Sequence, residues 1–236
     1  MGRFAEPRLT KTLRFSLRAE RPSLSAVPPR RRRLRLKDPL RYERDWWERG
    51  VECVAGVDEV GRGPLAGPVV AAAVILPVDA RVLGVSDSKL LSHRERLEVD
   101  MLVRGSARAI GVGATSAAEI DRMGMTAATR LALQRALDAL PVRPGHVVLD
   151  GRPVKGLGWE HKAIVKADYR IHCVACASVV AKVCRDRLMD RLHPRYPGYG
   201  WDHNKGYATE DHRDALKRLG PTPHHRKSFA GVRIEA

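Results

Sequence analysis

The chain of 236 residues has no long hydrophobic run, no internal repeat and no lipidation signal. No stretch approaches about 18 consecutive uncharged apolar residues, so no transmembrane helix is predicted. The N-terminus does not fit the myristoylation pattern, because Glu6 stands where that pattern needs Ser or Thr. Membrane-bound classes are therefore disfavoured, and a hydrophobic content of 44% predicts one main domain with a substantial core.

Cysteine is also scarce, with four residues in the whole chain. Cys173 and Cys176 have the spacing of a zinc or redox motif, but no second pair stands at zinc-finger spacing. The residues around them, 174 to 181, are small and apolar and are typical of a packed helix. We expect buried thiols rather than a metal or redox centre, and a protein suited to a reducing cytoplasm.

Acidic residues are few relative to basic ones. Asp and Glu number 27 against 43 Lys and Arg, which gives a formal charge of +16 and a pI near 10.4. Such a balance favours a polyanionic partner, most commonly nucleic acid, without separating DNA from RNA. About +9 of this charge lies in residues 1–45, so the remaining chain is only moderately basic.

Residues 1–36 are predicted to be a disordered basic arm rich in Arg and Pro. Arg30 to Arg33 form an unbroken run after Pro28 and Pro29, and the segment has little apolar periodicity. Three interpretations stay open: a solvated arm, a mitochondrial transit peptide, and a wrongly assigned start codon. Residues 37–50 are predicted to be a linker or a family-peripheral segment.

The body of the chain alternates strand and helix signals. Three hairpin-connected strands followed by βα units predict an α/β fold, with a mixed sheet covered by helices on its faces. Strands are expected at 53–60, 68–76, 107–114, 146–150 and 162–166, and helices at 126–140, 171–191 and 209–219.

Four acids fall at the predicted strand ends, where side chains from distant segments converge. They are Asp58, Glu59, Asp150 and Asp168. Adjacent carboxylates repel each other unless a cation lies between them, which points to a divalent metal. Each acid alone is more typical of a surface, capping or turn carboxylate. Neighbours on a regular strand point to opposite faces, so we expect distortion at this strand end, helped by Gly61.

Seven motifs together resemble bacterial ribonuclease HII over residues 51–232, while the arm lies outside the resemblance. Their joint order and spacing is far more specific than any one of them. They are Asp58-Glu59-Val60-Gly61-Arg62-Gly63, Asp87-Ser88-Lys89-Leu90, Leu149-Asp150-Gly151, Lys166-Ala167-Asp168, Ala181-Lys182-Val183-Cys184-Arg185-Asp186, Asn204-Lys205-Gly206-Tyr207 and His225-Arg226-Lys227-Ser228-Phe229.

The resemblance implies an RNase H-like fold with a central mixed five-stranded sheet, a catalytic domain at 51–195 and a substrate-binding helical segment at 196–236. It also implies cleavage of the RNA strand of RNA/DNA hybrids, and cleavage 5′ of single ribonucleotides in duplex DNA, with two Mg²⁺ or Mn²⁺ ions. Asp58 is then expected to bridge both metals. Asp150 and Glu59 would hold the metal on the leaving-group side, and Asp168 that of the attacking water.

Substrate recognition is assigned in the same way. The main chain of Gly61, Arg62 and Gly63 would read the 2′-hydroxyl, and Tyr207 would pack on the deoxyribose after the RNA-to-DNA junction. Ser88 and Ser228 would add hydrogen bonds to phosphate or act as caps. Asp186 is left out of the site, since an ion pair on a helix face explains it better. Phosphate contacts are expected from Lys89, Lys182, Lys205, Arg226 and Lys227.

Other classes remain for comparison. Ribonuclease HIII carries a folded N-terminal domain and lacks the Gly-Arg-Gly form, and a transposase or integrase nuclease would lack the Asn204 to Tyr207 and His225 to Phe229 motifs. A non-catalytic nucleic-acid binder would not need four intact acids. A monomer is expected, as in most of the family. The choice between Mg²⁺ and Mn²⁺, and any replication or repair partner, cannot be read from the sequence.

Overall fold

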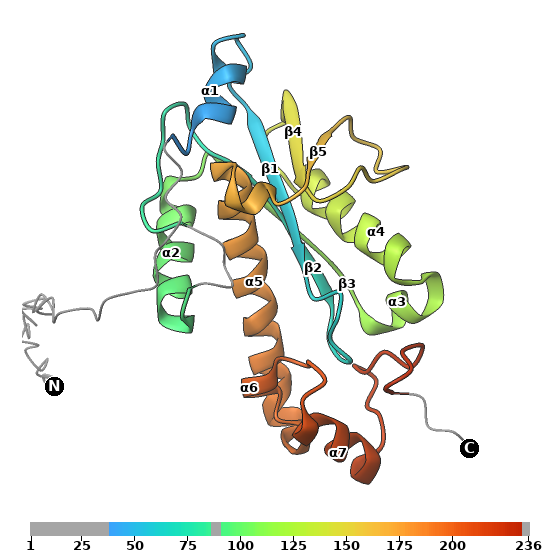
Figure 1. Cartoon of the computed structure of the whole chain (residues 1–236). Helices are drawn as coiled ribbons and strands as arrows, with labels where there is room; N and C mark the ends of the chain where they lie inside the picture. Colours follow the sequence, from blue (N-terminus) through green and yellow to red (C-terminus); the bar gives the residue numbers. More distant parts are fainter. Residues whose placement is uncertain (1–37, 86–90, 233–236) are drawn as a thin grey trace, which may run out of the picture. The chain divides into compact units, whose positions relative to one another are not determined.

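A computed structural model describes residues 38–85 and 91–232 of the chain (Figure 1). The predicted arm at 1–36 and the predicted phosphate contact Lys89 lie outside these residues. The strands are β1 (Val54–Val60), β2 (Val69–Ile75), β3 (Ala109–Thr115), β4 (His146–Asp150) and β5 (Lys162–Ile164). The helices are α1 (Arg41–Trp47), α2 (His93–Ser106), α3 (Ala117–Met123), α4 (Met125–Asp138), α5 (His172–Leu192), α6 (Trp201–Asn204) and α7 (Glu210–Leu219), with 3₁₀ turns η1 (Ala167–Tyr169), η2 (His193–Arg195) and η3 (Pro197–Tyr199).

The five strands form one mixed sheet in the order β3-β2-β1-β4-β5, as predicted. β2 pairs antiparallel with β1 and β3, whereas β4 pairs parallel with β1 and β5. The expected hairpin between the second and third strands is wrong, because helix α2 lies in that connection. Helices α2 and α3 begin with complete capping boxes, in which Ser92 pairs with Glu95 and Ser116 with Glu119.

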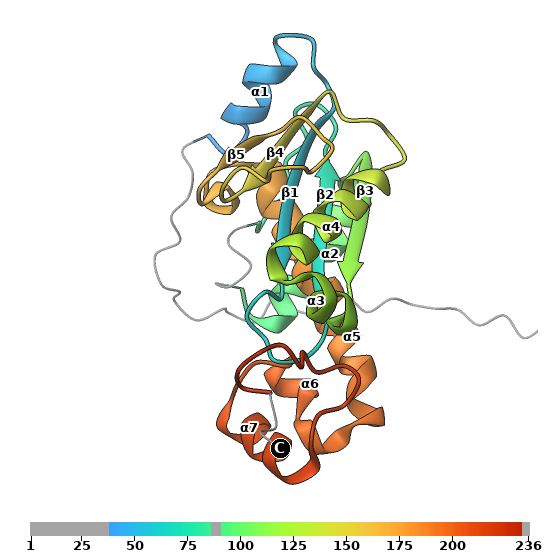
Figure 2. The same ribbon diagram turned by 90° about the vertical axis from the view of Figure 1, so that its right-hand side faces the viewer.

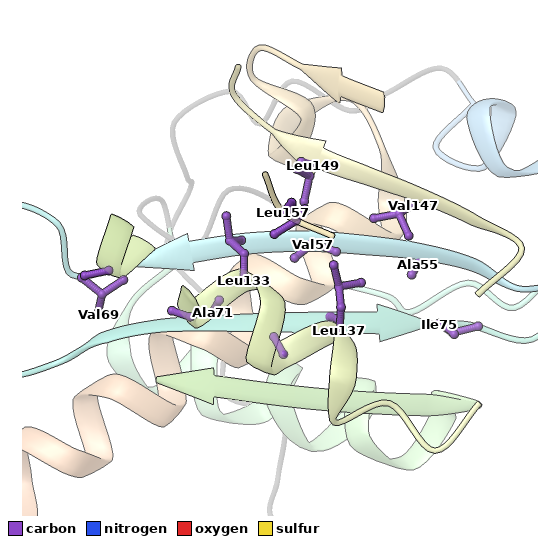
Figure 3. Packing of buried hydrophobic residues seen from close by; sticks show 14 of the residues in the cluster. Ala55, Val57, Val69, Ala71, Ile75, Leu133, Leu137, Val147, Leu149 and Leu157 are labelled. Carbon is purple, nitrogen blue, oxygen red and sulfur yellow. The ribbon is translucent and has the colours of Figure 1, made fainter. Parts of the chain in front are cut away.

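Helices cover both faces of the sheet, with α2 and α5 on one and α3 and α4 on the other (Figure 1). Strand β2 is buried throughout, since its side chains alternate between the two cores. On the α4 side, Val69, Ala71 and Ile75 pack with Leu133 and Leu137 of α4 (Figure 3). This alternation fixes the register of β2, and with it the end of the β1–β2 loop that leads into this strand.

Helix α5 lies very close to strand β1. A Cβ atom on Gly56 would come within 2.3 Å of the main chain of Cys173 and Val174, so only glycine allows this approach. The N-terminus of α5 is further held by Glu43 of α1, whose Oε1 accepts a hydrogen bond from the Cys173 N–H at 2.7 Å. The segment predicted at 37–50 as a linker or family-peripheral element thus contains a helix packed on the core.

Helices α6 and α7 and the chain up to Val232 gather around the C-terminal half of α5 (Figure 2). They form a separate apolar cluster in which Trp201 and Leu216 pack against Met189 of α5 and Leu65 of the β1–β2 loop. The loop after β1 is therefore held between the sheet and this C-terminal segment. Among the described residues, none of the helices combines the length and apolarity needed to cross a bilayer.

Candidate active site

The two central parallel strands separate where the acids begin. Pairing between β1 and β4 ends at Val57 and Leu149, and the next residues are Asp58 and Asp150. On its other edge β1 stays regularly paired with β2 through Val60. The expected distortion of the strand end is therefore not found in the β1–β2 ladder. The pairing of β1 ends earlier on the β4 side, where the next residue of each strand is an acid.

Asp58 is 8% exposed and has few partners. Its Oδ1 accepts a hydrogen bond from the Glu59 N–H at 2.8 Å, and its carboxylate also bonds the Ser178 side chain of α5. Burial raises the pKa of Asp58 well above its usual range, and the nearby Glu59 and Asp150 charges raise it further. This carboxylate is held in a place that penalises its negative charge.

Glu59 shares this environment but has a cationic partner. Its Oε1 lies 3.4 Å from Nη1 of Arg62, three residues along the chain. Burial raises the pKa of Glu59, and the Asp150 charge adds to that effect, while Arg62 opposes it. Because both acids of β1 respond to Asp150, these three carboxylates occupy one electrostatic site.

Asp150 and Asp168 are joined through the turn after β5. Asp150 Oδ1 accepts a hydrogen bond from the Ala167 N–H at 2.6 Å, and Asp168, 5% exposed, is the next residue along the chain. Lys166, before this turn, has φ of 59°, a left-handed conformation that side chains rarely adopt. A hydrogen bond from a main-chain N–H to the Asp150 carboxylate thus ties the 3₁₀ turn that carries Asp168 to the end of β4.

The carboxylate set fits a hard divalent cation, which prefers oxygen ligands. An ion among Asp58, Glu59 and Asp150 would offset both their burial and their mutual repulsion. Within residues 38–85 and 91–232, no three His, Cys, Asp or Glu side chains already converge tightly enough to hold an ion.

The loop that follows the acids is organised from beneath by Arg226. Its guanidinium donates to the carbonyls of Gly61, Arg62, Pro64 and Gly67, and the side chain is fully buried. Every donor that could have met a phosphate is therefore directed inward. The expected phosphate contact from Arg226 does not fit this structure and is corrected to a role in holding the loop.

Arg185 of α5 performs a parallel task and was not expected at the site. It is fully buried and donates to the carbonyls of Ala66, Pro68 and Lys205, at 2.9 to 3.0 Å. Its Cζ also lies 5.8 Å from the ring centroid of Tyr207. Arg185 thus joins the β1–β2 loop to the segment that carries Tyr207, which is 42% exposed.

A buried histidine pair supports Tyr207 from the other side. His212 Nδ1 donates to the Tyr207 carbonyl at 2.8 Å, and its Nε2 lies 3.0 Å from Nε2 of His225. His225 Nδ1 in turn accepts from the Thr222 N–H at 2.9 Å. One set of neutral tautomers satisfies all three bonds, with a proton on His212 Nδ1 and on His225 Nε2. Burial lowers the pKa of both rings, that of His225 to about 3.

The remaining residues predicted to contact phosphate differ in whether their side chains are ion-paired or exposed. Lys182 is mostly buried, and its Nζ donates to Asp186 at 2.6 Å, while Arg96 lies 3.5 Å from the same carboxylate. Asp186 is therefore in an ion pair, as expected.

Lys205 Nζ pairs with Asp190 and the Asp202 carbonyl. Lys227 is exposed, and Ser228 is bound as a turn residue, with its N–H and hydroxyl both donating to Asp121.

Sequence reasoning missed Ser178, Arg185 and the His212–His225 pair. Ser178 carries no signal, since it is one small residue in an alanine- and valine-rich helix. Arg185 was assigned with Asp186 to an ion pair on a helix face, although the two side chains have different partners. A histidine four residues after a Pro, or at the third position of a helix, has no distinctive spacing, so the pair is visible only in three dimensions.

Comparison with known proteins agrees with this geometry. The family described as ribonuclease HII matches residues 55–232. A ribonuclease HII of Synechococcus is 51% identical over 197 residues, which cover 82% of this chain and 89% of the relative. The ribonuclease H2 structure of Pyrococcus horikoshii has a TM-score of 0.66 at 28% identity, over 76% of this chain and 95% of that one. An Archaeoglobus fulgidus RNase HII solved with PCNA gives 0.66 at 29% identity, over 78% and 98%.

A mixed five-stranded sheet with acids at and just after the ends of β1, β4 and β5 defines an RNase H-like nuclease. The chain belongs to the ribonuclease HII family. It is thus a ribonuclease H endonuclease, of a family that depends on divalent metal ions. The α1 segment lies outside the matched residues, although it packs on the same core.

Proposed function

We propose that this ribonuclease H hydrolyses the RNA strand of RNA/DNA hybrids and cuts on the 5′ side of single ribonucleotides in duplex DNA. The products would be 5′-phosphate and 3′-hydroxyl ends. The observation that carries the proposal is one electrostatic site of Asp58, Glu59 and Asp150, directly followed by an exposed Arg62-Gly63 turn. Chemistry and recognition of the sugar would then occur a few residues apart.

The acids are assigned to two divalent ions, Mg²⁺ or Mn²⁺. When bound, such a pair activates a water and stabilises the leaving 3′ oxygen of an in-line displacement. Asp58, most buried of the β1 acids, would hold both ions. Asp150 and Glu59 would hold the ion on the leaving-group side, and Asp168 that of the water. All four acids belong to one chain, which supports action as a monomer.

The protein's own groups would orient the substrate. The main chain of Gly61, Arg62 and Gly63 is assigned to the 2′-hydroxyl, the one group that separates RNA from DNA at a given nucleotide. Tyr207 is exposed and fixed on both sides by Arg185 and His212, which suits packing against the next deoxyribose. Residues 196–236 would thus act as a substrate-binding segment attached to a catalytic domain at 51–195.

Exposed basic residues would add affinity without sequence preference. Lys227 and Arg62 have side chains open to solvent, and Lys182 could reach a phosphate only by leaving Asp186. Lys89 and the basic arm are assigned to the same role from their charge alone. Any contact with a replication or repair protein, such as the PCNA present with the Archaeoglobus relative, would be additional to this activity.

Three matched duplexes test the proposal: one with a single ribonucleotide, one with an RNA strand, and one of DNA only. With Mg²⁺ or Mn²⁺, cleavage should occur in the first two and not in the third. End labelling should place the first cut 5′ of the ribonucleotide and leave a 3′-hydroxyl. Equal cleavage of the DNA duplex would contradict sugar recognition, and cleavage in the presence of a chelator would contradict the metal assignment.

A further inference from the structure

Arg226 is a fully buried cation in a place where burial of charge is costly. In the part of the chain that the structure describes, no Asp or Glu lies within salt-bridge distance of its guanidinium. Burial and the neighbouring Arg185 both lower the pKa of Arg226. A buried arginine without a carboxylate partner is unusual, so what its donors hold defines its role.

All five donors of Arg226 are used on main-chain carbonyls. Nε and Nη2 donate to Gly67 at 3.1 and 2.9 Å, and Nη1 donates to Arg62 at 2.9 Å and Pro64 at 2.7 Å. Nη2 also donates to Gly61. The planar fork therefore gathers four carbonyls of the 61–67 loop around one group, which only the guanidinium can do.

This arrangement dictates where the opposite ends of two peptide groups point. In a planar trans peptide the C=O and the following N–H are antiparallel, and the described chain has no cis peptide. With the Gly61 and Arg62 carbonyls turned in toward Arg226, the N–H groups of Arg62 and Gly63 must point away from it. Arg62 and Gly63 are exposed, and neither N–H donates to any group among the described residues.

We propose that Arg226 is a positioning residue that presents the N–H groups of Arg62 and Gly63 as a donor pair for an acceptor oxygen of the bound ribonucleotide. Successive N–H groups on one side of a turn form a concave site for such an oxygen. The two buried cations Arg226 and Arg185 behind the loop add a favourable field. This inference rests on the proposed recognition of the sugar by residues 61–63.

The conservative variant Arg226→Lys separates positioning from charge. Lysine keeps the cation but has three donors on one nitrogen, so it cannot gather four carbonyls. We expect about a 10²-fold lower single-turnover rate on saturating single-ribonucleotide duplex, because misplaced binding groups cost that much. Affinity for an all-DNA duplex should change less than about twofold, with an unchanged salt slope.

Arg49→Lys is the matched control, since Arg49 is exposed after α1 and lies outside both the catalytic domain at 51–195 and the substrate-binding segment at 196–236. It should behave as wild type in every assay. Full cleavage by Arg226→Lys would overturn the proposal. So would an equal loss of affinity for both duplexes with a salt slope smaller by about one, the signature of a direct phosphate contact.

A second readout does not depend on activity. Trypsin can cut after Arg62 only when the 61–63 turn leaves its fixed form, and mass spectrometry follows that one bond. Arg226→Lys should be cut there faster than wild type and Arg49→Lys, while circular dichroism shows the fold retained. An unchanged cutting rate would overturn the proposal. If wild type fails to distinguish the ribonucleotide from DNA, the proposed function fails, yet the trypsin result still tests the loop.

Discussion

Two clusters of buried charge lie close together in this protein and are satisfied in opposite ways. The acid site holds negative charge on Asp58 and Glu59 whose pKa values are raised, with few internal partners. The second cluster holds positive charge on Arg185 and Arg226, whose donors are taken up by main-chain carbonyls, most of them in the loop after β1. The first cluster needs a cation from outside, whereas the second is complete within the chain.

In the proposed function, this difference separates the residues of the chemical step from those of sugar recognition. A buried carboxylate site with few internal partners lowers the stability of the fold and, in the proposed function, raises the affinity for metal ions. A loop held by many main-chain hydrogen bonds before substrate arrives needs less ordering on binding. The account therefore predicts that substitutions in the acid site change stability and activity in opposite directions, while those in the loop reduce both.

The largest effect is expected from Asp58→Asn, which removes one charge of the acid site. We expect turnover to fall by about 10³-fold or more, because a group that holds both ions supplies several kcal/mol of transition-state stabilisation. Metal-free thermal unfolding should occur at a higher temperature than in wild type, since the variant removes a carboxylate whose charge is disfavoured by burial and by the nearby Glu59 and Asp150. An active variant, or one less stable without metal, would contradict the assignment.

A smaller effect is expected where the histidine pair holds Tyr207. His212→Gln moves the amide to the Nε2 position and loses the bond to the Tyr207 carbonyl, while His212→Asn keeps a donor near Nδ1. We expect about a tenfold rise in KM on single-ribonucleotide duplex for His212→Gln only. This corresponds to a loss of about 1.4 kcal/mol in the free energy of substrate binding.

The control for that prediction is the same pair of substitutions in a Tyr207→Ala background. If His212 acts through Tyr207, the two double variants should have equal KM values. A persistent difference between them would show that His212 acts elsewhere in the segment.

The fold was predictable from sequence where pattern and topology coincide. Strand β2 and helix α5 are apolar over their whole or most of their length, which made both predictable. The acidic residue that ends β4, Asp150, was also predictable from the sequence. Helices α2 and α3 were missed although both carry Ser-x-x-Glu capping boxes, because their apolar positions are few. Helix α1 was missed because its stability comes from tertiary contacts, chiefly Glu43 at α5 and Trp46 stacked on His146.

The site was predictable in its residue types but not in its partners. Sequence order pointed to the acids and to the Gly61–Gly63 turn, yet it could not show that Arg226 faces inward. A basic residue in a basic motif suggests a phosphate contact until its surroundings are known. Arg226 is separated from the Gly61 carbonyl by 165 residues of sequence, and no local pattern encodes such a contact.

The stability of the C-terminal segment should depend on pH through His225. Its pKa in the fold is about 3, below the usual 6.5, because burial and the nearby His212 disfavour the charged ring. Below about pH 6.5 the unfolded chain binds a proton that the fold excludes, so the free energy of unfolding should fall between about pH 6.5 and pH 3. Denaturant titrations of wild type and His225→Gln across this range should give a steeper decline in wild type.

The opposite slope is expected from Asp58, whose raised pKa makes the fold bind the proton more readily than the unfolded chain. Its destabilising effect should grow as pH rises above about 4, so Asp58→Asn should gain most over wild type at neutral pH. Equal pH profiles for wild type and both variants would show that neither Asp58 nor His225 couples folding to pH.

The smallest effect belongs to the exposed phosphate contacts. Lys227→Ala should weaken binding to all duplexes alike and reduce the slope of log affinity against log salt by about one. Fluorescence anisotropy at several salt concentrations measures both quantities. A loss confined to the ribonucleotide duplex would instead place Lys227 in sugar recognition.

The most direct test of the central claim counts metal ions. Manganese titration, followed by electron paramagnetic resonance on the complex with a non-cleavable single-ribonucleotide duplex, gives the number bound. The account predicts two ions for wild type and at most one for Asp58→Asn and Asp150→Asn, with binding to the duplex retained. Equal ion counts in wild type and both variants would contradict a catalytic role for this carboxylate site.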